Sequence, residues 1–187
     1  MHVSSRWCVT AVFALGALSC SDPVAPPAQG AFIASVRQAS PPPAGKSCPT
    51  SPVTFDVPVL NDSKPLEALD RDTYLHKIID GEDNAKAACT VKGSSTFTFS
   101  GNLGLGARAL RIASGTLGAD KKGTALIIVT DTSRSIQFSS PGATCAIEAF
   151  QAKGGSMWAS FNCPAVERPP TDSCLSDGFF VLENCEQ

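Results

Sequence analysis

The sequence predicts an all-β protein: an antiparallel β-sandwich of Greek-key or jelly-roll type that is braced by disulfide bonds and follows a disordered N-terminal tether. Two features of the chain support this class. Short runs of β-branched and aromatic residues alternate apolar with polar side chains, and glycine, asparagine, aspartate and proline separate these runs. The chain also carries eight cysteines in 187 residues, a density typical of exported, disulfide-linked domains.

Alternation with a period of two residues places the expected strands between residues 53 and 182. In chain order they are 53–59, 74–79, 86–91, 96–100, 109–113, 125–130, 135–138, 144–151, 156–162 and 178–182. One segment, 65–71, is expected to form one or two helical turns because it opens with proline. Many short strands with turn residues between them favour a sandwich or barrel over a parallel sheet covered by helices.

The hairpin formed by strands 144–151 and 156–162 can be assigned residue by residue. A three-residue turn at 153–155 pairs Ile147 with Phe161 and Phe150 with Trp158. One face is then apolar and points into the core. The opposite face combines aromatic and polar side chains: Glu148, Phe150, Trp158, Ser160 and Asn162.

Those five residues are a candidate ligand-binding surface, because aromatic rings stack on sugars and polar neighbours bind hydroxyl groups. The alternative is an ordinary cross-strand aromatic pair on a face that the C-terminal hairpin covers, with Phe179 or Phe180 packing on Trp158.

The N-terminus has the organisation of a secretory signal peptide. Arg6 precedes an apolar run at 9–18, which is shorter than the ~20 residues needed to span a bilayer. Ala17-Leu18-Ser19-Cys20, at the end of this run, resembles the lipobox of bacterial lipoproteins. The resemblance implies that residues 1–19 are removed, that a diacylglyceryl group is attached to the Cys20 sulfur, and that the new amine is acylated. Ordinary signal cleavage after Ser19 is the alternative, and either way we expect the rest of the chain to be exported.

The cysteine count agrees with a lipid anchor. Cys8 leaves with the signal peptide and Cys20 carries the lipid, so an even number remains for disulfides. These structural cysteines are Cys48, Cys89, Cys145, Cys163, Cys174 and Cys185. The absence of a C-x-x-C pair favours disulfides over a zinc or redox site. We favour the pairing Cys174–Cys185, which closes a short loop, and Cys145–Cys163 and Cys89–Cys163 are competing pairs.

Residues 20–47 are expected to be the lipidated cysteine and its tether, and residues 48–187 the folded domain. Proline, alanine and serine dominate the tether and charged residues are few, which is typical of semi-extended linkers. An apolar interruption at 31–36 is expected to form a short helix or to dock on the domain or the membrane surface. Ser21 follows Cys20 where aspartate would retain a lipoprotein at the inner membrane, so resemblance to bacterial sorting signals favours the outer membrane.

Sequence motifs give little support for catalysis. His76 is the only histidine beyond the signal peptide, and no Gly-x-Ser-x-Gly segment is present, so neither a multi-histidine zinc site nor a hydrolase triad is expected.

The acidic segment 80–84 is interpreted as a solvated turn, with part of a calcium site as the alternative. The G-x-G-x-x-A pattern at 104–109 is interpreted as a loop, because no helix is expected after it. No cofactor or metal is expected, and a net charge of −2 excludes a strongly basic nucleic-acid binder.

Together these features predict a lipid-anchored cell-envelope protein that is not an enzyme and acts as a binding or structural module. Its expected partners are the membrane, through the N-terminal lipid, and a glycan or another envelope protein. The combination resembles small cysteine-containing envelope lipoproteins, a resemblance that implies no activity. The alternative is a carboxylate-dependent surface hydrolase or a calcium-binding protein, which clustering of Glu148 with Asp56, Asp80 or Asp131 in a cleft would favour.

Overall fold

A computed structural model gives the fold of this protein and describes residues 24–39, 46–48, 53–57, 78–168 and 172–187. The predicted signal peptide, Cys20, His76 and the predicted helical turns at 65–71 lie outside these residues. Parts of the predicted strands 53–59 and 74–79 lie outside them as well. No helix within the described ranges is long and apolar enough to cross a membrane.

Within the described ranges, eleven strands form one antiparallel sheet. In chain order they are β1 (Gln29–Arg37), β2 (Val53–Val57), β3 (Ile78–Ile79), β4 (Ala85–Gly93), β5 (Phe97–Leu105), β6 (Arg108–Leu117), β7 (Lys122–Asp131), β8 (Ile136–Ser139), β9 (Cys145–Lys153), β10 (Ser156–Arg168) and β11 (Asp172–Glu183). Their order across the sheet is β2-β1-β11-β10-β8-β7-β6-β5-β4; β3 pairs with β1, and β9 pairs with both β10 and β7. A 3-10 turn, η2 (Thr132–Arg134), connects β7 to β8.

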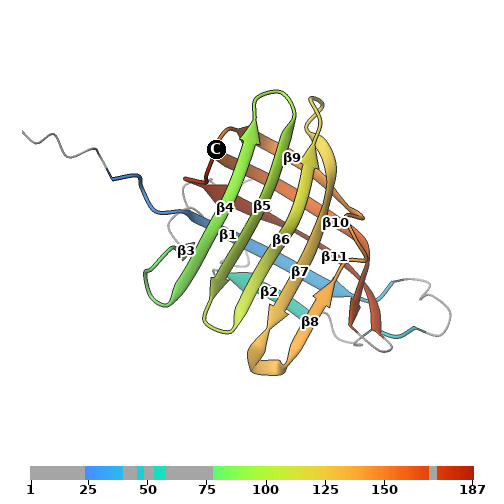
Figure 1. Cartoon of the computed structure of the whole chain (residues 1–187). Helices are drawn as coiled ribbons and strands as arrows, with labels where there is room; N and C mark the ends of the chain where they lie inside the picture. The colour runs from blue at the N-terminus through green and yellow to red at the C-terminus, as the bar shows by residue number, and fades with distance from the viewer. Residues whose placement is uncertain (1–23, 40–45, 49–52, 58–77, 169–171) are drawn as a thin grey trace, which may run out of the picture.

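The sheet folds back on itself into two layers, which confirms the predicted antiparallel β-sandwich. Figure 1 shows β4–β7 as one layer that crosses over β1, β2, β10 and β11. β8 and β9 lie between β7 and β10, where the sheet passes from one layer to the other. Alternate side chains of each layer point inward and form the core. Phe99 on β5 and Phe180 on β11 meet there, with ring centroids 6.0 Å apart.

The tether predicted for residues 20–47 is wrong in its central part, because Gln29–Arg37 is β1. This strand pairs with β11 along its whole length and with β2 on its other side. Its alternate side chains Phe32, Ala34 and Val36 are buried in the core. The apolar segment 31–36 therefore packs on the domain as a central strand, and not as a helix. Prolines on both sides of the segment suggested a linker, while the period-two pattern inside it specifies a strand.

All six cysteines beyond residue 20 are paired, as Cys48–Cys174, Cys89–Cys185 and Cys145–Cys163. The favoured pair Cys174–Cys185 is wrong, because the last strand is the 12-residue β11 rather than the short segment 178–182. An extended strand holds residues eleven positions apart at a distance of about 35 Å. The competing cross-strand pair Cys145–Cys163 is present, with Cα atoms 4.0 Å apart.

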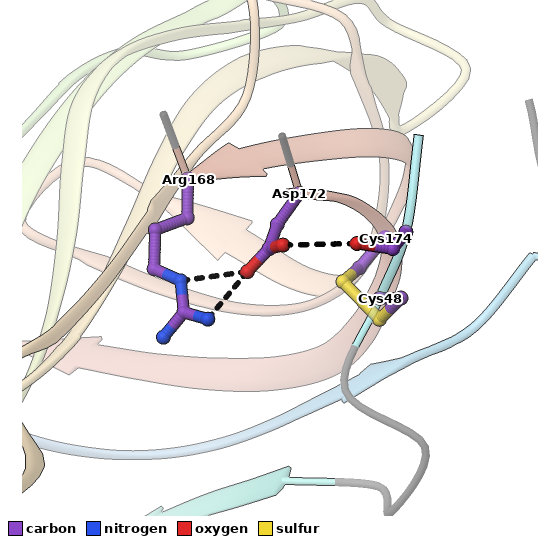
Figure 2. The surroundings of a disulfide bond; sticks show 5 residues. Cys48, Arg168, Asp172 and Cys174 are labelled. Atoms are coloured by element: carbon purple, nitrogen blue, oxygen red, sulfur yellow. Dashed lines mark hydrogen bonds and ion pairs between the residues drawn. A yellow bond between two sulfur atoms is a disulfide. The ribbon is translucent and has the colours of Figure 1, made fainter. Parts of the chain in front are cut away.

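The Cys48–Cys174 disulfide lies beside a small polar cluster at the start of β11. Arg168 Nε donates to the Asp172 carboxylate at 2.7 Å, and Ser47 Oγ donates to the same carboxylate at 3.3 Å. Figure 2 shows Arg168 and Asp172 facing each other next to the disulfide. These contacts and the disulfide together fix the segment that precedes β2 to the β10–β11 hairpin.

The outer edge of the sheet, at β4, is covered by three other parts of the chain. Asp80 Oδ1 accepts a hydrogen bond from the Ala87 N–H at 3.0 Å. Glu186 donates its backbone N–H to Cys89 O at 3.0 Å and accepts the N–H of Val91 at 2.9 Å, while the Gly155 N–H donates to Val91 O at 3.0 Å. Because these backbone groups are satisfied internally, β4 is protected from pairing with a strand of another chain.

Candidate functional site

The hairpin of β9 and β10 carries the five predicted site residues on one face. Its turn contains two residues rather than three, because Ser156 pairs with Lys153 across Gly154 and Gly155. A bulge then inserts Phe150 between the pairs Trp158↔Gln151 and Ala159↔Ala149. The bulge restores the predicted pair Ile147↔Phe161 further along the ladder. It also leaves Phe150 and Gln151, which are consecutive, both exposed.

Phe150 and Trp158 lie side by side on the outer face of the sandwich. Their ring centroids are 5.3 Å apart and the rings are tilted by 56°. Phe150 is 48% exposed, and Trp158 is partly buried because it packs against Phe179, Val181 and Ala31 of the neighbouring strands. The C-terminal strand therefore supports the aromatic pair from the side, since Val181 pairs with Trp158 within the sheet. Phe179 packs on Trp158, as the alternative of a covered pair expected, whereas Phe150 remains exposed and is not covered by the C-terminal residues.

A groove lies directly beside this pair on the same face. It has a volume of 510 Å³ and passes over β7, β9, β10 and β11. Glu148, Ser160 and Asn162 line it, as do Lys122 of β7 and Asp177 of β11. Along one row of the sheet, Lys122 pairs with Glu148 and Glu148 with Ser160. In the next row the small side chain of Ala146 lies opposite Asn162, which leaves room for the hollow.

The groove contains both positively and negatively charged side chains. Lys122 Nζ lies 4.0 Å from Glu148 Oε1, and both side chains are 65% exposed. Arg37 Nε lies 2.8 Å from Asp177 Oδ1 at the other end. Ser160 Oγ donates to the backbone oxygen of Glu148 at 3.3 Å. The surface therefore offers hydroxyl, amide, ammonium and carboxylate groups without a large net charge.

The acidic residues proposed for catalysis or calcium binding do not gather around Glu148. Asp131 lies at the opposite end of β7 from Lys122 and interacts with η2. Asp80 is bonded to the backbone of β4 in the tight turn between β3 and β4, and the side chain of Asp56 lies outside the described part of the chain. Within the described ranges, no three histidine, cysteine, aspartate or glutamate side chains are grouped so that they could hold a metal ion.

Asp177 and Lys122 are site residues that sequence reasoning missed. Asp177 is separated from Glu148 by β10, so that their Cα atoms are about 12 Å apart by strand spacing. Both residues lie on strands outside the predicted hairpin, and only the pairing of β7 and β11 with that hairpin brings them to the groove. No local sequence signal marks them.

The fold and the groove define a disulfide-braced, antiparallel β-sandwich with an aromatic and polar groove on the outer face of one layer. Searches for similarity to protein-family models, to curated proteins and to solved structures found no match. The functional argument therefore depends on the site itself.

Proposed function

We propose that this chain is a lipid-anchored protein of the bacterial cell envelope whose β-sandwich is a non-enzymatic binding module. The observation that carries the binding role is the Phe150–Trp158 pair, which is partly exposed beside a polar groove. Tryptophan is enriched at binding interfaces, where part of the ring packs on the protein and the rest meets the partner. The non-enzymatic role rests on the pairing of the groove carboxylates with cations, Glu148 with Lys122 and Asp177 with Arg37.

The disulfides support export, because disulfide bonds persist mainly in oxidising compartments. They also support a separate role for Cys20, since all six later cysteines are used in three internal pairs. We place the anchor in the outer membrane because Ser21 follows Cys20.

The tether implied by this proposal is short. β1 begins at Gln29, so the chain between Cys20 and the sheet consists of residues 21–28. Eight extended residues span at most about 28 Å. The binding module would therefore stay close to the membrane surface and meet ligands of the adjacent envelope layers rather than distant ones.

Intact mass spectrometry of the protein extracted from membranes tests the anchor. We expect a mass that includes diacylglycerol and an acyl chain on the chain that begins at Cys20, and release of Cys20→Ser into the soluble fraction. A membrane-extracted protein without diacylglycerol would overturn the anchor.

Co-sedimentation with isolated cell envelopes tests the binding module. The chain from residue 21 onward contains all described strands and is free of the lipid. We expect it to sediment with envelopes, and the double variant Phe150→Ala/Trp158→Ala to lose at least about tenfold in affinity, as loss of aromatic anchors usually does. Asn102→Ala, on the other layer, is the control. Equal sedimentation of all three proteins would contradict the binding role.

A further inference from the structure

We propose that the groove binds a neutral oligosaccharide, laid across the strands from β7 to β11 with one sugar ring against the Phe150–Trp158 pair. This inference rests on the proposed binding function and specifies the chemical class of its ligand.

The dimensions of the groove favour a chain of sugars over a single ring. Its lining residues come from β7, β9, β10 and β11, which are consecutive neighbours in this part of the sheet. Three inter-strand spacings amount to about 14 Å. The aromatic pair borders the groove along the strand direction, because Phe150 follows Glu148 by two residues and Trp158 precedes Ser160 by two, so the rings lie next to the polar row.

The bonding groups of the groove favour hydroxyl ligands over a peptide. A peptide in extended form gains affinity by adding to a free sheet edge, where main-chain groups are unpaired. The groove lies on a sheet face and crosses strands whose backbone groups are paired in ladders. What it offers instead are side-chain groups from Lys122, Glu148, Ser160, Asn162 and Asp177. Such short-range donors and acceptors match the hydroxyl and acetamido groups of sugars.

The charges favour a neutral ligand. The carboxylates of Glu148 and Asp177 line the groove, and each is accompanied by one cation, Lys122 and Arg37 respectively. A polymer with a regular series of phosphates or carboxylates would place anions near both carboxylates, and such like-charge contacts disfavour a partner. Nucleic acids and acidic polysaccharides are therefore poor ligands for this surface.

The aromatic pair supplies the apolar part of the recognition. Trp158 is held by Phe179, Val181 and Ala31 on the same face of the sheet, so little side-chain freedom is lost when a ligand binds. Phe150 remains 48% exposed next to it. The C–H groups on one face of a pyranose ring can pack on such rings, while the hydroxyl groups at the ring edge reach the polar row.

Trp158 makes a direct binding experiment possible, because it is the only tryptophan beyond the predicted signal peptide. The chain from residue 21 is titrated with neutral tetrasaccharides of N-acetylglucosamine, glucose and mannose, each with its monosaccharide, while Trp158 fluorescence is recorded. We expect at least one tetrasaccharide to shift the emission and to bind at least about tenfold more tightly than its monosaccharide, since only the longer ligand fills the groove.

The matched variants are Asn162→Ala in the groove and Asn102→Ala on β5 of the other layer, both exposed asparagines within a strand. We expect Asn162→Ala and Phe150→Ala to weaken tetrasaccharide binding about tenfold or more, with an unchanged thermal midpoint, and Asn102→Ala to bind as the native protein does. Calorimetry gives the same comparison for Trp158→Ala, which lacks the fluorophore.

An oligogalacturonate, an extended peptide and anionic lipid vesicles form the other arms of the experiment. The inference is wrong if no neutral tetrasaccharide binds, if one of these three probes binds more tightly than every neutral sugar, or if Asn102→Ala and Asn162→Ala behave alike. Envelope binding that depends on Phe150 without binding of neutral sugars would refute the ligand class and leave the proposed module standing. If neither envelope binding nor binding of neutral sugars is observed, both the ligand class and the proposed binding module are refuted.

Discussion

Asp131 is a buried carboxylate at the corner where β7 ends, and only 2% of its surface is exposed. The Ser133 N–H donates to its Oδ1 at 3.0 Å, and Arg108 and Arg134 lie 3.8 and 3.7 Å from its Oδ2. The hydrogen bond from the Ser133 side chain, together with the backbone N–H groups of the turn and the charge of Arg134, lowers the pKa of Asp131, although burial acts in the opposite direction. The charged form is thus the one that the fold stabilises.

We predict that Asp131→Ala lowers the free energy of unfolding by about 2 kcal/mol at pH 7, the usual cost of losing hydrogen bonds to a charged group. The pKa of an aspartate in the unfolded chain is near 3.9, and the folded-state pKa of Asp131 lies below it. The stabilisation by the charged carboxylate is therefore fully present above about pH 3.9 and is lost as the pH falls through the folded-state pKa. Urea unfolding of both proteins between pH 7 and pH 2 measures the difference.

The two unfolding free energies should differ by a constant amount from pH 5 to pH 7, and the difference should shrink at lower pH. Ser133→Ala should reproduce part of the loss, since it removes one donor and keeps the backbone turn. A difference that grows on acidification would mean that the carboxylate does not stabilise the fold in its charged form.

At the scale of single strands, the sequence predicted most of the sheet because alternation is a local property. The faces of β9 and β10 followed from it, including the buried Ile147 and the exposed Phe150. The turn length could not be predicted from alternation. The bulge at Phe150 compensates for a turn that is one residue shorter, so the strand pairs beyond the bulge, such as Ile147↔Phe161, are the same for both turn lengths. β1 was missed because its prolines lie at its flanks, where they suggest a linker, although prolines are compatible with strand ends.

The central position of β1 leads to a prediction about truncation. A chain that begins at residue 38 lacks Phe32, Ala34 and Val36, all buried, and lacks the partner of both β11 and β2. Burial of one Phe or Val side chain contributes about 1.5–3 kcal/mol, and the stability of a whole domain is about 5–15 kcal/mol. We therefore expect this chain to lose its cooperative unfolding transition in calorimetry.

A chain that begins at residue 24 is the control, and it should melt as the exported protein does. Had residues 20–47 been only a tether, both truncations would leave the thermal midpoint unchanged. A cooperative transition at the native midpoint for the chain from residue 38 would show that β1 is dispensable.

Two features could not be predicted from the sequence, namely the full set of groove residues and the disulfide connectivity, because both depend on pairing between strands far apart in the chain. Lys122 and Asp177 reach the groove through the pairing of β7 and β11 with the hairpin, and this pairing depends on which strands become neighbours. The disulfides Cys48–Cys174 and Cys89–Cys185 join residues 126 and 96 positions apart. Spacing along the chain favours nearby cysteines, whereas the extended β11 holds Cys174 and Cys185 at opposite ends.

At the scale of the whole molecule, the C-terminus completes the sandwich. Beyond β11, Cys185 is bonded to Cys89 of β4, and Glu186 forms a parallel bridge with Thr90. These contacts join the last residues to the edge of the opposite layer. The disulfide restricts the unfolded chain, and the backbone hydrogen bonds of Glu186 cover the strand edge. By contrast, Cys145–Cys163 connects neighbouring strands that nearby ladder pairs also hold together.

We predict that removing the Cys89–Cys185 disulfide has different effects from removing Cys145–Cys163, when both cysteines of a pair are replaced by serine. Loss of a crosslink that closes a loop of about 100 residues costs up to ~4.7 kcal/mol in the chain-entropy model, against ~3 kcal/mol for a loop of about 15 residues. Cys89→Ser/Cys185→Ser should therefore lower the thermal midpoint more than Cys145→Ser/Cys163→Ser. It should also produce concentration-dependent association below the melting temperature, because the C-terminal residues can detach and expose the edge of β4. Calorimetry and light scattering at two protein concentrations measure both effects.

A chain that ends at Cys185 separates the two causes. It keeps the Cys89–Cys185 disulfide but lacks Glu186, whose backbone bonds to Cys89 and Val91 cover the edge. It should associate while retaining most of the thermal midpoint, since the crosslink still limits the unfolded chain. If the Cys89→Ser/Cys185→Ser protein stays monomeric up to its melting temperature, the C-terminal contact adds stability alone and the edge of β4 needs no cover. If only the shortened chain stays monomeric, the disulfide itself, rather than the hydrogen bonds of Glu186, keeps other strands away.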